Sequence, residues 1–325
     1  MINDHPREFG RWLPDSLHSF TFLPDSRHVP GPAGMINRMS NPLVPLHRSH
    51  SRHFEQNKFV YPVVSRRSHG LSIGVNLNPD KICNFDCIYC QVDRRSEAEQ
   101  RFVEMERLLS EIEEMLTLVT TGELYQTPRF EQVPESLRRL NDIAFSGDGE
   151  PTTFKNFDEI ISEVAGIKRR FQLDQVKMVL ITNASMFHRP KVQAGLLTLD
   201  QNQGEIWAKL DAGTEAYYQL IERTKIPFQR ILDNLLLAAR VRPIVIQSLF
   251  MKVNGIPPAD SEITAYLQRL NDIQSNGGTI QLVQVYTVAR PPAESFVSSL
   301  SNQEVDRIVQ RIQQETALPA EAYYA

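Results

Sequence analysis

The 325-residue sequence has few cysteines, and it lacks the long apolar runs of membrane proteins. Its three cysteines all lie within residues 83–90, and this odd, clustered set excludes a disulfide framework, which needs even numbers of cysteines spread along the chain. No apolar run is long enough to cross a bilayer, and the N-terminus lacks the basic-then-apolar pattern of a secretory signal. These absences predict a cytoplasmic protein that does not associate with a membrane.

A strong net charge is also missing. The formal charge is −4, so no general basic field attracts nucleic acid, and any such binding has to be local. The hydrophobic content of 41% is enough to bury one sizeable core, in one large α/β domain or in two ordinary domains.

The three cysteines form one motif. Cys83, Cys87 and Cys90 have the spacing C-x3-C-x2-C and follow an apolar stretch, residues 71–77, that reads as a strand. Thiols this close cannot share one face of a straight strand or helix, so the loop has to turn them toward a common centre. Zinc would need a fourth ligand, most often His. A 4Fe–4S cluster normally takes four thiolates, so three leave one iron open to an external chelator.

Strand and helix patterns alternate along residues 55–325, which we predict to be one domain. The expected strands are residues 71–77, 142–145, 176–181, 205–210, 244–253 and 279–288. The expected helices are 96–119, a short one after 190, and 156–170, 227–240, 260–273 and 302–315. Ser96 and Glu99 form a capping box for the first helix, and Phe102 begins its apolar stripe. Six strand–helix units predict a parallel sheet and are too few for a closed eight-stranded barrel, so the expected fold is α/β, an open, partial (β/α)6 barrel.

Residues 1–54 differ from the rest of the chain. They hold six of the eight histidines and many Pro, Ser and Arg residues, without a helical or strand period. His47, His50 and His53 are spaced to cluster on a helix and bind a metal, but no acidic or cysteine partner accompanies them. An irregular or mobile extension is therefore favoured, while an arm over the active site and a non-native extension stay open.

A second motif follows the expected strand at 142–145. Gly147 and Gly149 flank Asp148, just before Glu150, and two glycines so placed let the backbone approach a ligand closely. A plain strand-to-helix turn would explain the same pattern. The cysteines, this motif and Asn183 all follow strands, so they are expected at the C-terminal end of the sheet, where barrel enzymes build their sites.

Other polar residues interrupt or end apolar strands. Lys209 and Asp211 alternate on one strand and share a face, either toward the barrel interior or as an internal salt bridge. The amide of Asn183 suits hydroxyl groups, or simply a turn. The candidate substrate contacts are Gln247, Gln284 and Tyr286.

The C-x3-C-x2-C spacing, with the aromatic Tyr89 just before the third cysteine, resembles the signature of radical S-adenosylmethionine (SAM) enzymes. The resemblance implies one 4Fe–4S cluster on Cys83, Cys87 and Cys90, whose open iron binds SAM. An electron from the reduced cluster then splits SAM, and the resulting 5′-deoxyadenosyl radical abstracts hydrogen from a substrate. It also implies the partial six-unit barrel that the alternation predicts independently.

The second motif is similar to the glycine–glutamate motif with which this superfamily holds the amino group of SAM, although Asp148 stands where many members have glycine. Glu150 is the expected ammonium contact, since a carboxylate and an ammonium group make a charge-assisted hydrogen bond. The residues that the resemblance assigns to SAM are Tyr89, Gly147, Asp148, Gly149, Glu150, Asn183, Lys209 and Asp211.

Residues 61–311 resemble a group of radical SAM proteins related to the wyosine (4-demethylwyosine) synthases, on stretches 71–94, 145–152, 207–213 and 284–292. Those synthases act on a tRNA guanosine and carry a second iron–sulfur cluster, for which this sequence has no cysteines left. The wyosine reaction is therefore not expected. The flavodoxin-like domain of the eukaryotic versions is also missing from this sequence, so the expected electron donor is a separate flavodoxin or ferredoxin.

The substrate stays open between a tRNA base and a small molecule or peptide. Basic groups at 66–67, 94–95, 138–139 and 168–170 would favour tRNA if they converge around the barrel mouth. The alternative that is not an enzyme is a zinc-stapled binding protein.

Overall fold

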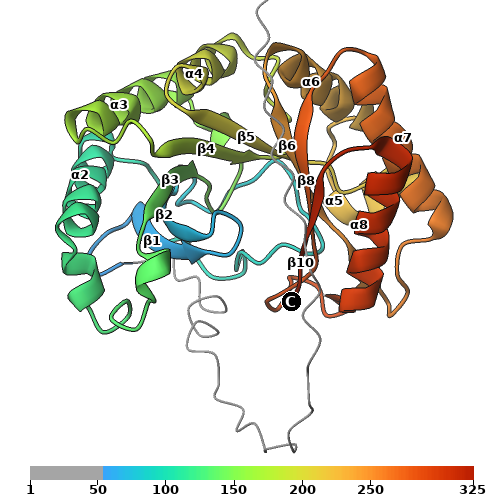
Figure 1. Ribbon diagram of the computed structural model, residues 1–325, viewed down its shortest axis with the longest axis horizontal. Helices are drawn as coiled ribbons and strands as arrows, with labels where there is room; N and C mark the ends of the chain where they lie inside the picture. The colour runs from blue at the N-terminus through green and yellow to red at the C-terminus, as the bar shows by residue number, and fades with distance from the viewer. Residues whose placement is uncertain (1–53) are drawn as a thin grey trace, which may run out of the picture. The chain divides into compact units, whose positions relative to one another are not determined.

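A curled sheet of eight strands, in the order β1-β2-β3-β4-β5-β6-β8-β10, forms the centre of the computed structural model, which describes residues 54–325 (Figure 1). Its strands are β1 (Val60–Ser65), β2 (Gly70–Val75), β3 (Leu140–Phe145), β4 (Lys177–Thr182), β5 (Gly204–Lys209), β6 (Ile244–Leu249), β8 (Ile280–Tyr286) and β10 (Ala320–Tyr323). A separate two-stranded sheet pairs β7 (Met251–Val253) with β9 (Val297–Ser299).

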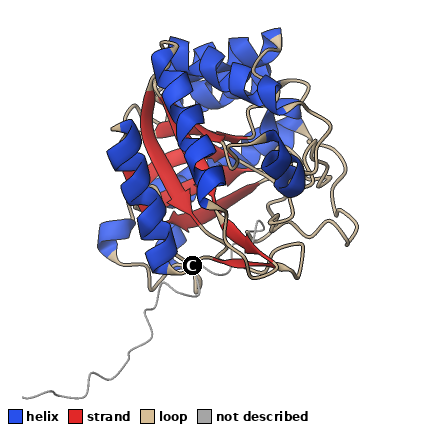
Figure 2. Ribbon diagram, turned by 90° about the vertical axis from the view of Figure 1, so that its right-hand side faces the viewer, coloured by secondary structure: helices blue, strands red, loops and turns tan. Residues whose placement is uncertain are grey.

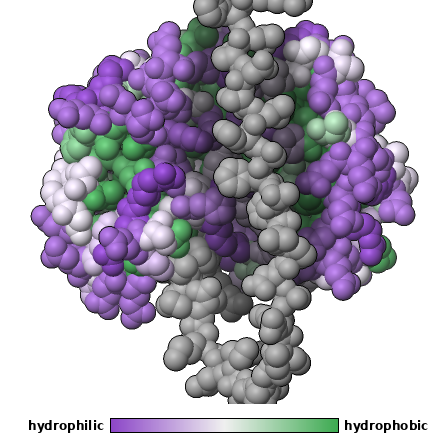
Figure 3. All heavy atoms as spheres, viewed as in Figure 1, coloured by the Kyte–Doolittle hydropathy of each residue, from purple (hydrophilic) through white to green (hydrophobic). Residues whose placement is uncertain are grey.

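Helices cover the outer face of the curled sheet (Figure 2). They are α2 (Met105–Thr121), α3 (Phe157–Arg170), α4 (Pro190–Asp200), α5 (Glu215–Glu222), α6 (Phe228–Val241), α7 (Asp260–Ser275) and α8 (Asn302–Thr316), with the 3₁₀ turns η1 (Glu123–Gln126), η2 (Glu135–Leu137) and η3 (Pro151–Thr153). The apolar faces of these helices pack on the sheet to form the main core. Hydrophilic side chains cover most of the outer surface around the sheet (Figure 3).

The pairing confirms the predicted α/β partial barrel. From β2 to β8 the neighbouring strands are parallel, as a succession of strand–helix crossovers requires, and β1 alone pairs antiparallel, with β2. The inner face of the sheet carries a small apolar cluster of Ala144, Val179, Trp207 and Val245. Within the described residues, no helix is long and apolar enough to cross a membrane.

The first helix is shorter than predicted. It begins at Met105, and Phe102, expected in the core, is 79% exposed. Asp93 accepts bonds from the backbone N–H groups of Arg95 and Ser96, and the Ser96 hydroxyl oxygen accepts a bond from Lys81 Nζ. These local bonds offer Ser96 an alternative to capping a helix, so the capping-box prediction is wrong.

The strand predicted over residues 244–253 divides at Phe250. Its first part, β6, belongs to the barrel sheet, whereas β7 pairs with β9 outside it. The other elements that were not predicted are β1, β9, the short helix α5, the three 3₁₀ turns, and β10, which adds another parallel strand beside β8. Arg66 Nη1 donates to the carbonyl of Tyr324 at 2.7 Å and so joins the two edges of the curled sheet.

The proposed N-terminal extension, residues 1–54 with His47, His50 and His53, lies outside the described residues except for Phe54. The division of the chain at residue 54 stays a prediction.

Candidate active site

A cavity of about 360 Å³ lies inside the curled sheet, toward the C-terminal ends of its strands. The structure brings most of the predicted site residues to its wall. Those that line the cavity are Cys83, Cys87, Tyr89, Cys90, Gly147, Asp148, Gly149, Glu150, Asn183, Lys209, Gln247 and Tyr286. Asp211 and Gln284 are buried behind the wall, at 3% and 2% exposure.

The cysteine loop is held by the end of helix α5. Asp86 N–H donates to the carbonyl of Glu222 at 3.1 Å, and Ile88 N–H donates to that of Ile221 at 2.9 Å. The Thr224 hydroxyl donates to another loop carbonyl, that of Asn84. The loop backbone is therefore fixed even though the loop is neither helix nor strand, and its three thiols face one cavity.

The three thiols have different neighbours. Cys87 Sγ donates to Glu222 Oε2 at 2.7 Å, and burial together with this carboxylate raises the pKa of Cys87 well above its usual value. Burial also raises the pKa of Cys83. Cys90 Sγ instead accepts a bond from the Arg94 guanidinium at 3.5 Å. Because metal-bound sulfur is thiolate, loading a metal group here must release protons from buried thiols.

The donor set fits an iron–sulfur cluster. The three cysteines are free and supply the soft thiolate ligands that such clusters take. The positive side chains of Arg94 and Lys209 lie close enough to Cys83 and Cys87, respectively, to offset the charge of a thiolate. As the side chains stand, the described residues contain no group of three or more His, Cys, Asp or Glu side chains able to hold a metal ion.

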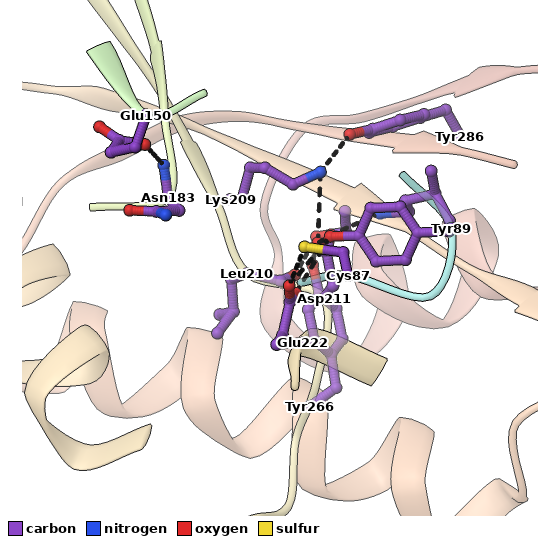
Figure 4. Close-up of polar contacts among 12 residues, drawn as sticks. Cys87, Tyr89, Glu150, Asn183, Lys209, Leu210, Asp211, Glu222, Tyr266 and Tyr286 are labelled. Carbon is purple, nitrogen blue, oxygen red and sulfur yellow. Dashed lines mark hydrogen bonds and ion pairs between the residues drawn. The ribbon is translucent and has the colours of Figure 1, made fainter. Parts of the chain in front are cut away.

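A charged network lies beneath Cys87 (Figure 4). Lys209 Nζ is 3.4 Å from Asp211 Oδ2 and donates to the Tyr286 hydroxyl at 3.0 Å. The Tyr89 hydroxyl lies between Asp211 and Glu222, within hydrogen-bonding distance of both carboxylates. Lys209 and Asp211 thus form the internal salt bridge that was one of the two interpretations of their shared face.

Burial and charge shift the pKa values of this network. Burial alone would lower the pKa of Lys209, but Asp211, Tyr286 and Glu222 outweigh it and hold that pKa well above its usual value. Burial, with Asp211 nearby, raises the pKa of Glu222 to about 8. Asp211 also accepts from the backbone N–H of Leu249 at 2.7 Å, which ties the network to β6.

Glu150 is surrounded by neutral donors. Its Oε1 accepts from the Thr152 N–H at 3.1 Å and from the hydroxyls of Thr152 and Thr182, both at 2.5 Å. Its Oε2 accepts from the Asn183 N–H at 2.7 Å. Burial raises the pKa of Glu150, and these donors oppose that rise. With one bond among the described residues, Oε2 keeps a lone pair for another donor.

The glycines beside Asp148 allow a close approach within the protein. A Cβ on Gly149 would lie 2.1 Å from the carbonyl oxygen of Ile82, and one on Gly147 would lie 2.3 Å from Asn76 Oδ1. Asp148 itself accepts from Asn76 Nδ2 at 2.7 Å. The glycine turn thus packs against two segments: a larger residue at Gly149 would displace the start of the cysteine loop, and one at Gly147 would displace Asn76, which follows β2.

Asn183 also binds the cysteine loop. Its Nδ2 donates to Asn84 Oδ1 at 2.9 Å, and its Oδ1 accepts from the Ser185 N–H at 3.0 Å. Of the substrate candidates, Gln247 Nε2 donates to Gln284 Oε1 at 2.8 Å, so these two amides bind each other. The binding roles predicted for these residues stay predictions.

Only two of the four predicted basic groups, 66–67 and 94–95, reach the cavity. Arg138 donates to the Val133 carbonyl, Lys168 donates to the Asn202 carbonyl, and Arg170 pairs with Glu113. These groups come before β3 and at the end of α3, at the opposite end of the sheet from the cysteines. The basic residues that do line the cavity are Arg66, Arg67, Arg94, Lys209 and Arg290.

Sequence reasoning missed Glu222 and Arg67. Glu222 lies on α5, an eight-residue helix, and the signal that was available is Thr214, whose hydroxyl caps that helix by accepting from the Tyr217 N–H. For Arg67 the sequence favours a solvated surface over an anion contact near the cysteine loop, and nothing local to its sequence says that it lies inside the barrel.

Comparison with known proteins places this geometry in a family. The profile of the radical SAM superfamily matches residues 77–265. The chain is 23% identical over 251 residues to a protein named GTPase Obg from Brachyspira hyodysenteriae, covering 76% of this chain and 32% of the relative. It is 25% identical over 237 residues to a UPF0026 protein of Helicobacter pylori, covering 71% and 66%. The chain thus spans about a third of the first relative and just under two thirds of the second.

Solved structures agree on the fold. A radical SAM methyltransferase from Sphaerobacter thermophilus superposes with a TM-score of 0.57 at 12% identity, covering 82% of this chain and 69% of that one. At this identity the likeness concerns the fold alone. An archaeal TYW1, a wyosine synthase, gives a TM-score of 0.43 at 12% identity over 85% and 81% of the chains, which is too low to support an argument.

Proposed function

We propose that this chain, which belongs to the radical SAM superfamily and is an enzyme of that class, uses one 4Fe–4S cluster to cleave SAM and abstract hydrogen from its substrate. The observation that carries the proposal is the shared cavity: the thiols of the C-x3-C-x2-C motif and the buried carboxylate of Glu150 line the same wall. When bound, the cluster would supply the electron that splits the sulfonium of SAM into methionine and a 5′-deoxyadenosyl radical.

The chain's own residues would hold and orient these groups. Cys83, Cys87 and Cys90 would ligate the cluster, on a loop whose backbone α5 fixes. The second oxygen of Glu150 would accept a bond from the ammonium group of SAM, beside the backbone of Gly147–Gly149. Asn183 supports this site by tying Glu150 to the cysteine loop.

Partners and location follow as part of the proposal. The electron donor to the cluster would be a flavodoxin or ferredoxin. The reaction would take place in the reducing cytoplasm, where clustered thiols stay free. A tRNA base stays a candidate substrate beside a small molecule or peptide. The positions of Arg138, Lys168 and Arg170 away from the cavity count against tRNA, whereas Arg66, Arg67 and Arg94 do line the cavity.

The test is anaerobic reconstitution with iron and sulfide, followed by reduction with dithionite in the presence of SAM. We expect an electron paramagnetic resonance signal of a reduced cluster that changes when SAM is added, and chromatography should detect 5′-deoxyadenosine. Binding of zinc in place of iron, with SAM left uncleaved, would overturn the proposal, and the cysteine loop would then be a structural zinc site.

A further inference from the structure

Arg67 extends into the barrel from the turn between β1 and β2. Its guanidinium lies 5.8 Å from the centre of the Trp207 ring on β5 and 5.4 Å from that of Tyr286 on β8. In the sheet order, β5 and β8 are separated from the β1–β2 hairpin by several strands, so this side chain crosses the interior of the curled sheet. Arg67, Trp207 and Tyr286 all line the cavity that contains the cysteines.

The cavity wall has more positive than negative side chains. The basic ones are Arg66, Arg67, Arg94, Lys209 and Arg290, and the acidic ones are Asp142, Asp148 and Glu150. The carboxylates are engaged by protein donors: Asp142 accepts from the Ser72 hydroxyl, Asp148 accepts from Asn76, and Glu150 has the donors described above. Lys209 has Asp211 as its counter-ion. The cavity therefore favours an anionic ligand over a neutral or cationic one.

Arg67 differs from the other basic groups in its neighbours. Arg66 donates to a carbonyl, and Arg94 donates to a carbonyl and to Cys90. Arg67 contacts two aromatic rings and lies close enough to Arg66 and Tyr323 to act on their charge, and no carboxylate of the described residues forms an ion pair with it. A guanidinium held between rings keeps its planar edge of N–H donors available, and that edge matches a carboxylate or a phosphate.

The wall beside Arg67 suits a flat or apolar group. Trp207 is 7% exposed, and its indole N–H donates to Glu205 Oε2 at 3.1 Å, which fixes the plane of the ring. Glu205 in turn forms an ion pair with Lys177, so its charge is already balanced. Ala144 and Ile181, from β3 and β4, extend the apolar surface next to this ring. A volume of about 360 Å³ is at the low end for ligand pockets, which favours a small substrate group beside this ring.

We propose that Arg67 is the anion-recognition residue of the substrate site, and that the substrate is a small molecule with a carboxylate or phosphate group joined to a flat or apolar body that packs on Trp207. This proposal rests on the proposed function only in taking this cavity as the site where substrate binds. Arg67 would orient the substrate by its anionic end and so turn its body toward the cysteine end of the cavity.

The experiment uses Trp207 as a reporter. The chain has two tryptophans, so Trp12→Phe leaves Trp207 as the single emitter. The full-length chain is titrated with benzoate, phenyl phosphate and the neutral benzyl alcohol, and Trp207 fluorescence is the readout. Calorimetry then repeats the titration on the chain that carries its reconstituted cluster. We expect at least one anion to bind saturably, benzyl alcohol to bind at least about tenfold more weakly, and Arg67→Gln to remove that preference.

Two variants complete the design. Arg67→Lys keeps the charge without the planar fork, so we expect it to restore part of the preference for anions. Arg170→Gln removes a surface arginine and should leave all three titrations unchanged. Binding of benzoate alone identifies a carboxylate substrate, and binding of phenyl phosphate alone identifies a phosphorylated one.

Three outcomes would each overturn the assignment: equal binding of benzyl alcohol and the anions, no binding of any probe, or unchanged anion affinity in a folded Arg67→Gln variant. The role of Arg67 would then be to fill space inside the barrel. If Arg67→Gln does not fold, as judged by circular dichroism, Arg67→Lys decides the same question. The fluorescence titration needs neither SAM nor the cluster. Failure to form 5′-deoxyadenosine would therefore contradict the proposed radical SAM function but would not test the role of Arg67 in anion binding.

Discussion

Two groups of buried carboxylates flank the cysteine loop, and they are held in opposite ways (Figure 4). Glu150, 3% exposed, is bound by backbone N–H groups and threonine hydroxyls, all of them neutral. Asp211 and Glu222, both 3% exposed, share one cation, Lys209, with the Tyr89 hydroxyl between them. Both arrangements stabilise buried carboxylates, but only the donors around Glu150 do so without a counter-ion.

This difference determines how strongly a substitution destabilises each region. A carboxylate held by several neutral donors loses a fraction of its support when one donor is removed. A buried ion pair such as Lys209–Asp211 loses its balance at once when the lysine is removed, because the carboxylate charge is left buried and unpaired. The Glu150 region thus suits a ligand-binding wall of fixed shape, while the Lys209 region supports the cysteine loop through charge.

The largest expected effect lies on the cysteine side. Cys87→Ala removes a thiol ligand, and two thiolates are too few to hold the cluster, so reconstituted iron should fall to background and SAM cleavage should cease. Iron and sulfide analysis with electron paramagnetic resonance checks this. A variant that still carries a full four-iron cluster would contradict the ligand assignment.

Lys209→Met tests the charged network directly. It leaves the Asp211 carboxylate buried without its cation, and we expect a loss of about 3–5 kcal/mol in the free energy of unfolding. The matched control is Arg170→Ala, which breaks the surface pair with Glu113 and should cost at most about 1 kcal/mol. Urea unfolding followed by circular dichroism measures both, and equal losses would show that the buried network depends on its lysine no more than a surface pair depends on its arginine.

Glu150→Gln tests the neutral-donor region. The amide cannot accept from all four donors and carries no charge, so SAM affinity should fall roughly tenfold or more while iron content stays intact. Thr152→Val is the control, since it removes one donor to Oε1 and leaves Oε2, the oxygen assigned to SAM, unchanged. Unchanged SAM affinity in Glu150→Gln would remove its role in binding the ammonium group.

The smallest effect is expected from removing residues 1–50. The described lining of the cavity begins at Tyr61, and both carboxylate regions are built from later residues, so SAM cleavage should stay intact. Loss of turnover in a folded truncated chain would show that the extension contributes to the site.

The fold was predictable because its signal is local. Each strand–helix unit has its own periodicity, and six units in strict alternation restrict the topology to a parallel partial barrel. The prediction failed where local signals conflict, as at Ser96, whose expected cap is replaced by bonds to Asp93 and Lys81. It also failed for short elements such as α5, whose eight residues hold too few turns for a clear pattern.

The site was predictable only in part. Residues at strand ends were expected to share one edge, and the cysteines, Glu150 and Asn183 do line one cavity. The contact between Cys87 and Glu222 joins residues 135 positions apart, and no local pattern encodes it. The position of Arg67 depends on the curl of the whole sheet, which brings β5 and β8 opposite the first hairpin.

The hydrogen bond from Arg66 to the Tyr324 carbonyl determines when, during synthesis of the chain, the cavity wall can be completed. It joins residues 258 positions apart, and the neighbouring Tyr323 is part of the cavity wall. Chains emerge from the ribosome N-terminal end first, so the cysteine loop is made long before β10. The wall next to Arg66 is completed only when β10 has been made, so the cavity depends on a strand that is synthesised long after the cysteine loop.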